Sequence, residues 1–381
     1  MLAAPAYLRH LPAPELELPE GGRVHVVAPD IRSGDAVGNL ALDVARALRR
    51  HGVEVKLWAN QFGDDLFGGV LRANRLGDHV RAEDVVFYQY STGDPSLDVV
   101  LGAPCPKLCF YQGITPPELL AEVEPKAAAV CAAGQRALPR LAGFDGFLAG
   151  SSFMAGELRD ALGEAAEIGI APPTLGLDRF RSLEAKPVAP PGVARFLLYV
   201  GRFAPHKGID FLIDAFAAHA ELDPTCDLVL AGSPAGEAFV ARLAAHRAAL
   251  PGALGARVHV IACPTDAQLK SLYGTCSAYV SASEHEGFGL PLAEALGFGK
   301  PVFARETPAV RETLGGAGRL FSERDPRSLA EGWRELLTDP ATRAAQRSAA
   351  GRRFQELRSA ADGRRIWRAL SAVVSRAARV S

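Results

Sequence analysis

Apolar residues occur along the first half of the chain in short runs that alternate with stretches of helical spacing. The runs are rich in β-branched and aromatic residues, which favour strands. They lie at residues 23–29, 53–58, 85–90, 107–111, 146–149 and 168–170. Helical patterns separate several of them, at residues 39–51, 117–141 and 152–162. Because strands that alternate with helices form parallel sheets covered on both faces, this half predicts an α/β domain.

The same alternation begins again after a segment rich in proline and polar residues, 171–192, which is the best candidate for a linker. The strands expected beyond it are residues 196–201, 227–232, 258–261, 278–282 and 302–304. The helices expected between them are residues 208–220, 235–249, 265–273 and 291–298. The fold class predicted is therefore α/β, with two doubly wound parallel-sheet (Rossmann-like) domains. Their predicted ranges are 23–190 and 191–355, after an irregular lead-in of residues 1–22.

Composition narrows the class of protein. A length of 381 residues accommodates two domains, and a formal net charge of −1 gives no support to a nucleic-acid partner. The six cysteines are scattered without CxxC pairs, which argues against a zinc site and a disulfide framework. Residues 1–22 contain Pro and Glu where a signal peptide would be apolar, and no window has the length of a membrane-spanning helix. We therefore expect a cytoplasmic protein.

The C-terminal stretch, residues 343–379, is rich in arginine and poor in acidic residues. One interpretation is a solvated helix, and another is a basic helix that contacts anionic lipid headgroups at the inner face of the cytoplasmic membrane. A third follows from Ile366, Trp367, Leu370 and Val374, whose spacing gives the segment an apolar face. On that interpretation residues 356–381 form a basic helix that packs back on the N-terminal domain.

Residues 283–295 contain the most informative motif, Ser-Glu-His-Glu-Gly-Phe-Gly-Leu-Pro-Leu-Ala-Glu-Ala. An expected strand precedes it and an expected helix follows, which places backbone N–H groups at a helix N-terminus, where phosphates bind well. Glu286 falls on the loop and Glu294 inside the helix, so both carboxylates can face one crevice and accept hydrogen bonds from sugar or ribose hydroxyls. Taken alone, the pair also fits a βα turn with solvated acids.

A second motif, residues 200–208, also lies between an expected strand and an expected helix. Arg202 offers a planar fork for phosphate oxygens, and Lys207 offers a mobile point charge. Together they could neutralise a nucleoside diphosphate, although alone they also fit two ordinary surface cations. No Asp-x-Asp stands where a metal–diphosphate site would need it, so the sequence predicts no metal ligands.

The two motifs together resemble the signatures of retaining glycosyltransferases of family 4 (glycosyl transferases group 1). The resemblance implies the GT-B fold, with an active site in a cleft between two Rossmann-like domains. It also implies a nucleotide-diphosphate sugar as donor and no cofactor. Arg202 and Lys207 would hold the diphosphate, Glu294 the ribose and Glu286 the sugar. The other donor-binding residues implied are Phe288, Gly289 and Leu290 on the loop, and Ile261 beside the base.

Residues 87–91 and 111–118 resemble the first domain of bacterial O-antigen and exopolysaccharide transferases, which are mannosyltransferase-like. Those relatives commonly carry His where this chain has Gln89 and Gln112, and Gln cannot exchange a proton near neutral pH. In the family, the loop that contains Gly38 borders the donor and acceptor sites.

Two functional hypotheses follow from this resemblance. The first is an enzyme that moves a mannose-type hexose to a saccharide or lipid-linked saccharide acceptor in cell-surface polysaccharide or lipopolysaccharide synthesis. The alternative, which Gln89 and Gln112 motivate, is a catalytically silent nucleotide-sugar-binding partner of a glycan synthase complex. A phosphorylase on the same fold is disfavoured because it needs a pyridoxal-phosphate lysine and a much longer chain.

Overall fold

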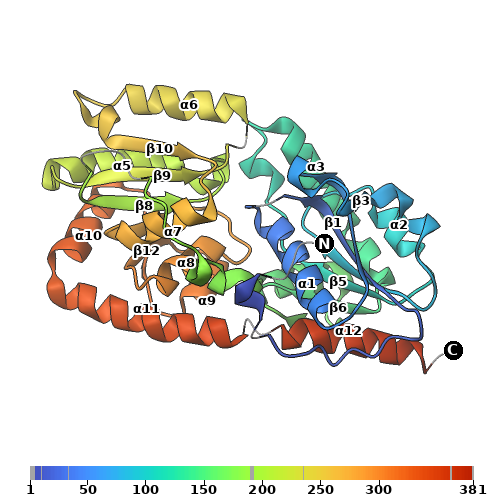
Figure 1. Cartoon of the computed structure of the whole chain (residues 1–381). Coiled ribbons are helices and arrows are strands. Elements are labelled where there is room, and N and C mark those ends of the chain that lie inside the picture. The colour runs from blue at the N-terminus through green and yellow to red at the C-terminus, as the bar shows by residue number, and fades with distance from the viewer. Residues whose placement is uncertain are drawn as a thin grey trace. The chain divides into compact units, whose positions relative to one another are not determined.

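The structure is a computed structural model that describes residues 5–9, 11–32, 34–188, 193–234, 236–360 and 363–379. By their contacts the residues form two units (Figure 1). The first unit comprises Met1–Thr115, Ala129–Ser182 and Arg358–Ser381, and the second comprises Pro116–Ala128 and Leu183–Leu357. The second unit thus includes Pro116–Ala128, which the predicted range 23–190 assigned to the first domain. The predicted boundary at 190/191 lies outside the described residues.

The first unit is built on a parallel sheet with the strand order β3-β2-β1-β4-β5-β6-β7. Its strands are β1 (Val24–Ile31), β2 (Val55–Phe62), β3 (Val70–Arg72), β4 (Val85–Tyr90), β5 (Lys107–Tyr111), β6 (Gly146–Ala149) and β7 (Ile168–Ile170). Its helices include α1 (Ala36–Arg50), α2 (Leu97–Leu101), α4 (Ser152–Leu162) and α12 (Arg364–Ala377). The strand order reverses between β1 and β4, which creates a topological switch point at the carboxyl edge of the sheet.

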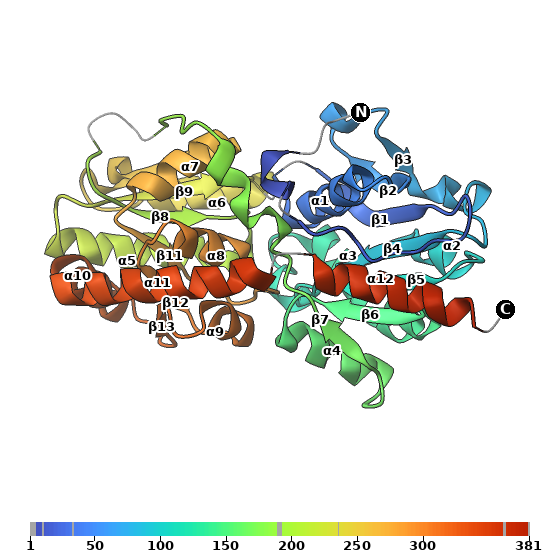
Figure 2. The ribbon, with the colours of Figure 1, turned by 60° about the horizontal axis from the view of Figure 1, so that its bottom comes forward.

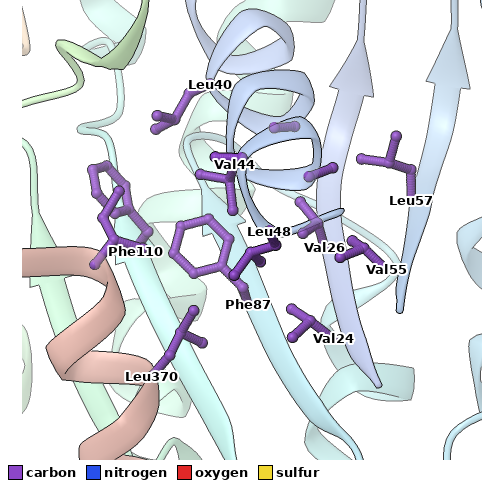
Figure 3. Close-up of a cluster of buried hydrophobic side chains, with 14 of the residues drawn as sticks. Val24, Val26, Leu40, Val44, Leu48, Val55, Leu57, Phe87, Phe110 and Leu370 are labelled. Atoms are coloured by element: carbon purple, nitrogen blue, oxygen red, sulfur yellow. The ribbon is translucent and has the colours of Figure 1, made fainter. Parts of the chain in front are cut away.

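Helix α1 packs its apolar stripe on this sheet. Leu40, Val44 and Leu48 lie in one buried cluster with strand residues such as Val26 and Leu57 (Figure 3). Burial of each such side chain contributes roughly 1.5–3 kcal/mol. The helix begins at Ala36, three residues before the predicted start, because the side chain of Asp35 caps it by accepting hydrogen bonds from the N–H groups of residues 37 and 38.

Helix α12 completes the same core. Ile366, Trp367, Leu370, Val373 and Val374 are buried in the cluster that contains α1 and β1, and the helix lies across β5, β6 and β7 (Figures 2 and 3). The interpretation of this segment as a merely solvated helix is therefore wrong for α12, whose charged side chains occupy only its outer face.

Two polar contacts also attach the C-terminal segment to the first unit. The guanidinium of Arg358 lies 2.7 Å from the carboxylate of Asp178, and Arg365 donates to the carbonyl of Ile170 at 2.9 Å. The arginine-rich stretch divides into α11 (Pro340–Ala360) and α12, and residues up to Leu357 belong to the second unit.

Part of the predicted lead-in is also packed. Leu8 and Leu11 are buried in the first unit's core, beside a short 3₁₀ turn, η1 (Ala6–Leu8). Tyr7 donates its hydroxyl hydrogen to the Asp43 carboxylate at 2.7 Å. Burial raises the pKa of Asp43 to about 6, with the hydrogen bond from Tyr7 acting against the shift. The lead-in therefore contributes to the core although it has little regular structure.

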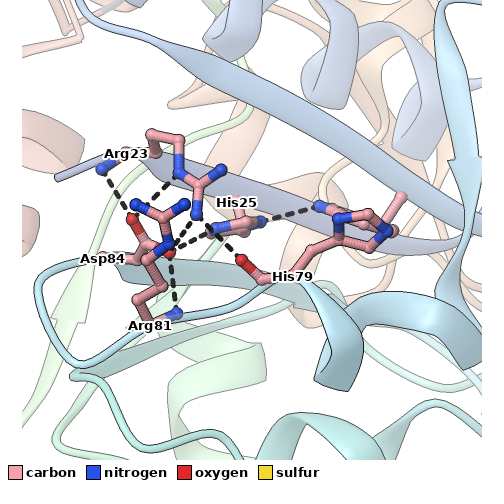
Figure 4. A network of polar contacts seen from close by, with 6 residues as sticks. Arg23, His25, His79, Arg81 and Asp84 are labelled. Atoms are coloured by element: carbon pink, nitrogen blue, oxygen red, sulfur yellow. Dashed lines mark hydrogen bonds and ion pairs between the residues drawn. The ribbon is translucent and has the colours of Figure 1, made fainter. Parts of the chain in front are cut away.

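A buried network joins the amino ends of β1 and β4 (Figure 4). The Asp84 carboxylate accepts hydrogen bonds from the backbone N–H of Arg23 at 2.9 Å and from its Nη2 at 3.0 Å. It also lies 3.0 Å from His25 Nε2, while Trp58 Nε1 donates to His25 Nδ1 at 2.9 Å. Because the indole only donates, His25 is neutral with its hydrogen on Nε2. Burial lowers its pKa further, in spite of the neighbouring Asp84.

The second unit is built on a parallel sheet with the order β10-β9-β8-β11-β12-β13. Its strands are β8 (Phe196–Val200), β9 (Asp227–Gly232), β10 (Val258–Ala262), β11 (Ala278–Ser281), β12 (Val302–Arg305) and β13 (Arg319–Phe321). Its helices are α5 (Ile209–Leu222), α6 (Glu237–Ala248), α7 (Asp266–Thr275), α8 (Leu290–Gly297), α9 (Pro308–Leu314), α10 (Pro326–Thr338) and α11. The order reverses between β8 and β11. Two doubly wound parallel sheets were predicted, and the structure confirms them.

One predicted helix is wrong. Residues 117–141 do not form a single helix but a 3₁₀ turn, η4 (Pro117–Leu119), a non-helical stretch, and then α3 (Pro125–Ala137). Proline disfavours helical backbone at the preceding residue and suits the first turn of a helix, so Pro125 begins a new helix. In the described residues, no helix has both the length and the apolar character needed to cross a membrane.

Candidate active site

Both sequence motifs of the second unit lie at its switch point. Strands β8 and β11 are adjacent, with Leu197 beside Ala278, so the loops that follow them leave the same edge of the sheet together. The backbone N–H of Glu284 donates to the carbonyl of His206 at 2.8 Å, which links the two loops. Gly208 makes this approach possible, because it has a φ of +60° and a Cβ there would lie 2.5 Å from the carbonyl oxygen of Ala282.

Lys207 and Glu286 form an ion pair at this junction. Lys207 Nζ lies 2.8 Å from Glu286 Oε1, and the two side chains are only 16% and 17% exposed. Because the pair is partly buried, water and salt screen its attraction less than they screen that of a surface pair. The structure therefore brings together the cation of one motif and the loop carboxylate of the other.

The side chain of Arg202 extends from the same loop as Lys207 into solvent. Its side chain is 56% exposed, and its Nη2 lies 3.7 Å from Glu124 Oε2. The hydroxyl of Tyr199 donates to the backbone carbonyl of Arg202 at 3.1 Å, which fixes the backbone from which the guanidinium extends. Arg202 thus presents an exposed fork of donors that can rotate toward an anion.

The residues at the start of α8 shape the remainder of the loop. Gly289 is the N-cap residue, with a φ of +84°, and a Cβ there would lie 2.7 Å from the Leu292 side chain. Phe288 is buried, and its carbonyl accepts a hydrogen bond from the Thr313 hydroxyl. Leu290 is the first helical residue, and Pro291 follows in the first turn. Pro291 has no N–H, and the N–H of Leu292 donates to the carbonyl of Gly289 at 3.0 Å. The N–H groups of Gly289 and Leu290 are therefore the ones that this turn can offer to an anionic group.

Glu294 differs from the expectation of an open carboxylate in a crevice. It is buried, 4% exposed, and its Oε2 accepts a hydrogen bond from the hydroxyl of Tyr273 at 2.8 Å. The ring of Tyr273 in turn stacks on Phe298, with ring centroids 5.4 Å apart. Helix α7 therefore orients this carboxylate, a partnership that the spacing of the motif alone did not indicate.

Two histidines near the ion pair are neutral. Burial is the main cause that lowers the pKa of His206 to about 2, with Lys207 next. Burial also lowers the pKa of His285, again with Lys207 as the next cause. Lys207 and Arg202 therefore carry the positive charge of this site near neutral pH.

Ile261 is half-buried on β10, which lies two strands away from β8 in the same sheet. The next residues toward the carboxyl end are exposed, and Cys263 has a φ of +49°. Backbone of this kind is unusual for a residue other than glycine and gathers at functional loops. Ile261 therefore has a position suited to bordering a ligand, although it is separate from the Lys207–Glu286 pair.

The three candidate residues of the first unit lie together at its own switch point. Gln89 is buried at the end of β4, and its amide hydrogen-bonds to that of Gln112, the residue after β5. The Gln89 amide also lies 3.2 Å from the carbonyl of Val37 and 3.1 Å from the N–H of Ala41, in the first turns of α1. Gly38 belongs to the first turn of α1 rather than to the preceding loop. A Cβ there would lie 2.4 Å from the carbonyl of residue 32, so packing explains this glycine.

Within the described part of the chain, His, Cys, Asp and Glu side chains form no group of three or more that could hold a metal ion. Asp64 and Asp65 lie in a short 3₁₀ turn of the first unit, η2 (Asp64–Leu66).

Comparisons with known proteins agree with this geometry. Residues 181–353 match the family described as glycosyl transferases group 1, a region that contains both motifs and nearly coincides with the main segment of the second unit. A GDP-mannose:cellobiosyl-diphosphopolyprenol alpha-mannosyltransferase from Komagataeibacter xylinus is 32% identical over 143 residues, which are 37% of this chain and 35% of that protein. The chain thus spans about a third of the length of this curated relative.

Solved structures resemble nearly the whole chain. An α,α-trehalose 6-phosphate synthase from Burkholderia multivorans superposes with a TM-score of 0.69 at 12% identity, over 94% of this chain and 98% of that one. WaaG, a glycosyltransferase involved in lipopolysaccharide biosynthesis, superposes with a TM-score of 0.65 at 15% identity, over 94% and 99%. At such identities the likeness establishes the fold, which is the predicted GT-B fold. The residues that match the family all lie in the part of the chain that carries Arg202, Lys207, Glu286 and Glu294.

Proposed function

We propose that this chain, whose residues 181–353 belong to the glycosyl transferases group 1 family, is a retaining glycosyltransferase that uses a nucleotide-diphosphate sugar. The observation that carries the proposal is the ion pair between Lys207 and Glu286, which joins the two family motifs at a topological switch point. Ligands of doubly wound sheets bind at such points.

In the proposed reaction the bond between the anomeric carbon and the diphosphate oxygen breaks, and the acceptor oxygen forms its bond on the same face. The diphosphate leaves with the electron pair, so the main electrostatic task is to stabilise its growing negative charge. Arg202 and Lys207 supply the positive charge for this task, with the N–H groups of Phe288, Gly289 and Leu290 beside them. The leaving phosphate takes the acceptor proton, and no metal or cofactor takes part.

The two glutamates receive different roles. Glu286, on the loop and paired with Lys207, accepts hydrogen bonds from the sugar hydroxyls close to the diphosphate. Glu294, oriented by Tyr273, accepts hydrogen bonds from the ribose hydroxyls, and Ile261 borders the base. A carboxylate that is already held by a neighbouring hydroxyl loses little conformational freedom when it binds a ligand.

The similarity to an alpha-mannosyltransferase supports a hexose of mannose type as the proposed donor sugar. The acceptor proposed is a saccharide or a lipid-linked saccharide in cell-surface polysaccharide synthesis. A groove between α12 and β6–β7 of the first unit favours a peripheral contact with an anionic membrane, because Arg365, Arg368 and Arg376 line it. Two acidic side chains, Asp145 and Glu167, line the same groove and weaken its positive charge.

A second candidate function is a catalytically silent protein that binds a nucleotide sugar within a synthase complex. The paired amides of Gln89 and Gln112 favour it, because neither can exchange a proton at the position where relatives carry His. Turnover distinguishes the two candidates.

The test is the release of nucleoside diphosphate from a panel of nucleotide sugars, with NMR assignment of the product anomer and a lipid extract as acceptor source. We expect turnover with retained configuration. Lys207→Met should abolish most of it, whereas Lys186→Met, which changes an exposed lysine of the same unit, should not. An inverted product would refute the retaining mechanism. Donor binding without turnover would favour the silent partner.

A further inference from the structure

An acidic segment of the second unit, residues 116–124, lies beside Arg202, one of the two cations of the candidate donor site. It consists of the turn η4 and the non-helical stretch before α3, and it carries Glu118, Glu122 and Glu124. Val123 packs against the second unit's hydrophobic core, which holds the segment in place. The charge of Glu118 acts on His285, where it opposes the larger effect of burial on the pKa.

Glu124 occupies a position suited to an anionic ligand. Its Oε2 lies 3.7 Å from Arg202 Nη2. Its side chain is only 10% exposed, and its Oε1 is buried without a hydrogen-bond partner among the described residues. The carboxylate also lies beside Gly236, since a Cβ on Gly236 would be 3.8 Å from Oε1. Gly236 is the N-cap residue of α6. A guanidinium and a helix N-terminus are together a favourable environment for phosphate.

The backbone restrains Glu124 at this place. Its N–H donates to the carbonyl of Leu120 at 2.7 Å, and its own carbonyl accepts from the N–H of Ala128 at 2.9 Å. A carboxylate oxygen that is desolvated without a hydrogen bond costs free energy. The contact with Arg202 is long for an ion pair, so the guanidinium compensates this cost only in part. Arg202 is therefore held loosely, by an anion that a stronger one can replace.

We propose that Glu124 is an internal competitor of the donor diphosphate for Arg202. Glu124 pairs with the guanidinium when no donor is bound. The pair separates when the diphosphate binds, because phosphate oxygens accept two parallel N–H hydrogen bonds from the guanidinium. The carboxylate then repels the bound anion, lowers its affinity and favours release of the nucleoside diphosphate product. This inference rests on the proposed function, and it assigns the acidic segment a regulatory role at the same site.

The experiment is calorimetric titration of the full chain with a panel of nucleoside diphosphates (GDP, UDP and ADP). Glu124→Gln keeps the shape of the side chain and removes its charge. We expect it to tighten binding of the preferred diphosphate roughly two- to fivefold, the gain expected when one weak ion pair is lost. Glu122→Gln, an exposed residue of the same segment, should leave the affinity unchanged. In an Arg202→Ala background, Glu124→Gln should give no gain.

Other outcomes would overturn either the inference or the proposed function. Equal or weaker binding by a folded Glu124→Gln variant would overturn the inference and make Glu124 a residue that positions Arg202 for the ligand. The same gain in the Arg202→Ala background would also overturn it, because the effect would then be a general change of charge. If the wild-type chain bound none of the diphosphates, the proposed function would fail first and the inference with it.

Discussion

Lys207 Nζ lies 2.8 Å from Glu286 Oε1, although 79 residues separate them in the sequence. The ion pair links the loops that follow β8 and β11, the two adjacent strands at the switch point of the second unit. In the proposed donor complex, the same two side chains lie where the bond between sugar and diphosphate breaks. The ion pair therefore keeps both groups in place before the donor arrives, which reduces the reorganisation needed in the transition state.

Lys207→Met should reduce kcat/KM roughly ten- to a hundredfold, since one lost charged hydrogen bond is worth about 1.5–3 kcal/mol. Most of the loss should appear in kcat, because the lysine charge matters most as the diphosphate leaves. Steady-state kinetics with Lys186→Met as the matched control measures this. A Lys207→Met enzyme with the wild-type kcat would remove the lysine from the proposed chemistry.

The free energy of unfolding should fall as the pH drops from 7.5 to 5.5. Burial lowers the pKa of His206 to about 2, with Lys207 contributing, whereas in the unfolded chain it is about 6.5. Between these values the unfolded state binds the additional proton, so acidification removes stability, by up to about 1.4 kcal/mol per pH unit for each such histidine. The pKa values of His25, His219 and His285 are also lowered by burial.

Two buried carboxyl groups act in the opposite sense. Burial raises the pKa of Asp43 to about 6 and that of Glu157 to about 7. Both groups therefore increase the free energy of unfolding of the protein as the pH falls toward 4. The net fall expected between pH 7.5 and 5.5 requires that the four histidines together exceed these two carboxyl groups. Chemical unfolding at several pH values measures how the free energy of unfolding depends on pH. This dependence should be less steep in His206→Gln than in the wild type. An identical slope in both proteins would mean that His206 is not buried as a neutral group.

Leu370→Ala should destabilise the protein by roughly 2–5 kcal/mol, the usual cost of a cavity in a well-packed core. Leu370 is fully buried between α12 and the first unit's sheet. Arg368→Ala, two residues earlier on the exposed side, should change stability by less than about 0.5 kcal/mol. Removal of the chain after Leu357 should lower the melting temperature further. An unchanged melting temperature after that truncation would contradict the packing of α12.

Turnover should persist in excess EDTA. Arg202 and Lys207 supply the positive charge that a divalent ion provides to diphosphates in metal-dependent sites. The measurement is the initial rate with and without chelator, followed by addition of magnesium or manganese. Activity that disappears in EDTA and returns with either metal would show that the two side chains are insufficient.

Much of the fold could be predicted because buried parallel strands are continuous apolar runs. Residues 85–90 and 107–111 are predicted strands that the structure reproduces as β4 and β5 without a change of boundary. The three-residue strands β3 and β13 were not predicted, whereas β7, which is equally short, was predicted from its two isoleucines. Helix α3 was misjudged because an apolar helical pattern extends across Pro125, and the backbone restriction of the proline prevails over the pattern.

The candidate site was predictable where it follows the order of strand, loop and helix. The motifs place Lys207 and Glu286 at the carboxyl ends of two strands, and the adjacency of those strands makes them neighbours. The partners of Arg202 and Glu294 could not be predicted in the same way. Glu124 and Tyr273 come from other elements, and only tertiary packing brings their side chains to the site.

We propose that the loop and helix of residues 283–295 bind the two ends of a nucleotide sugar. A binding experiment compares the affinity of wild type, Glu286→Gln and Glu294→Gln for an intact nucleotide sugar and for the bare nucleoside diphosphate. Glu286→Gln should weaken binding of the nucleotide sugar relative to that of the bare diphosphate, because only the sugar loses a hydrogen-bond partner. Glu294→Gln should weaken both ligands by a similar factor, roughly ten- to a hundredfold for one charged hydrogen bond. The reverse pattern would exchange the two roles, and wild-type affinities in both variants would contradict the assignment of this motif as the donor site.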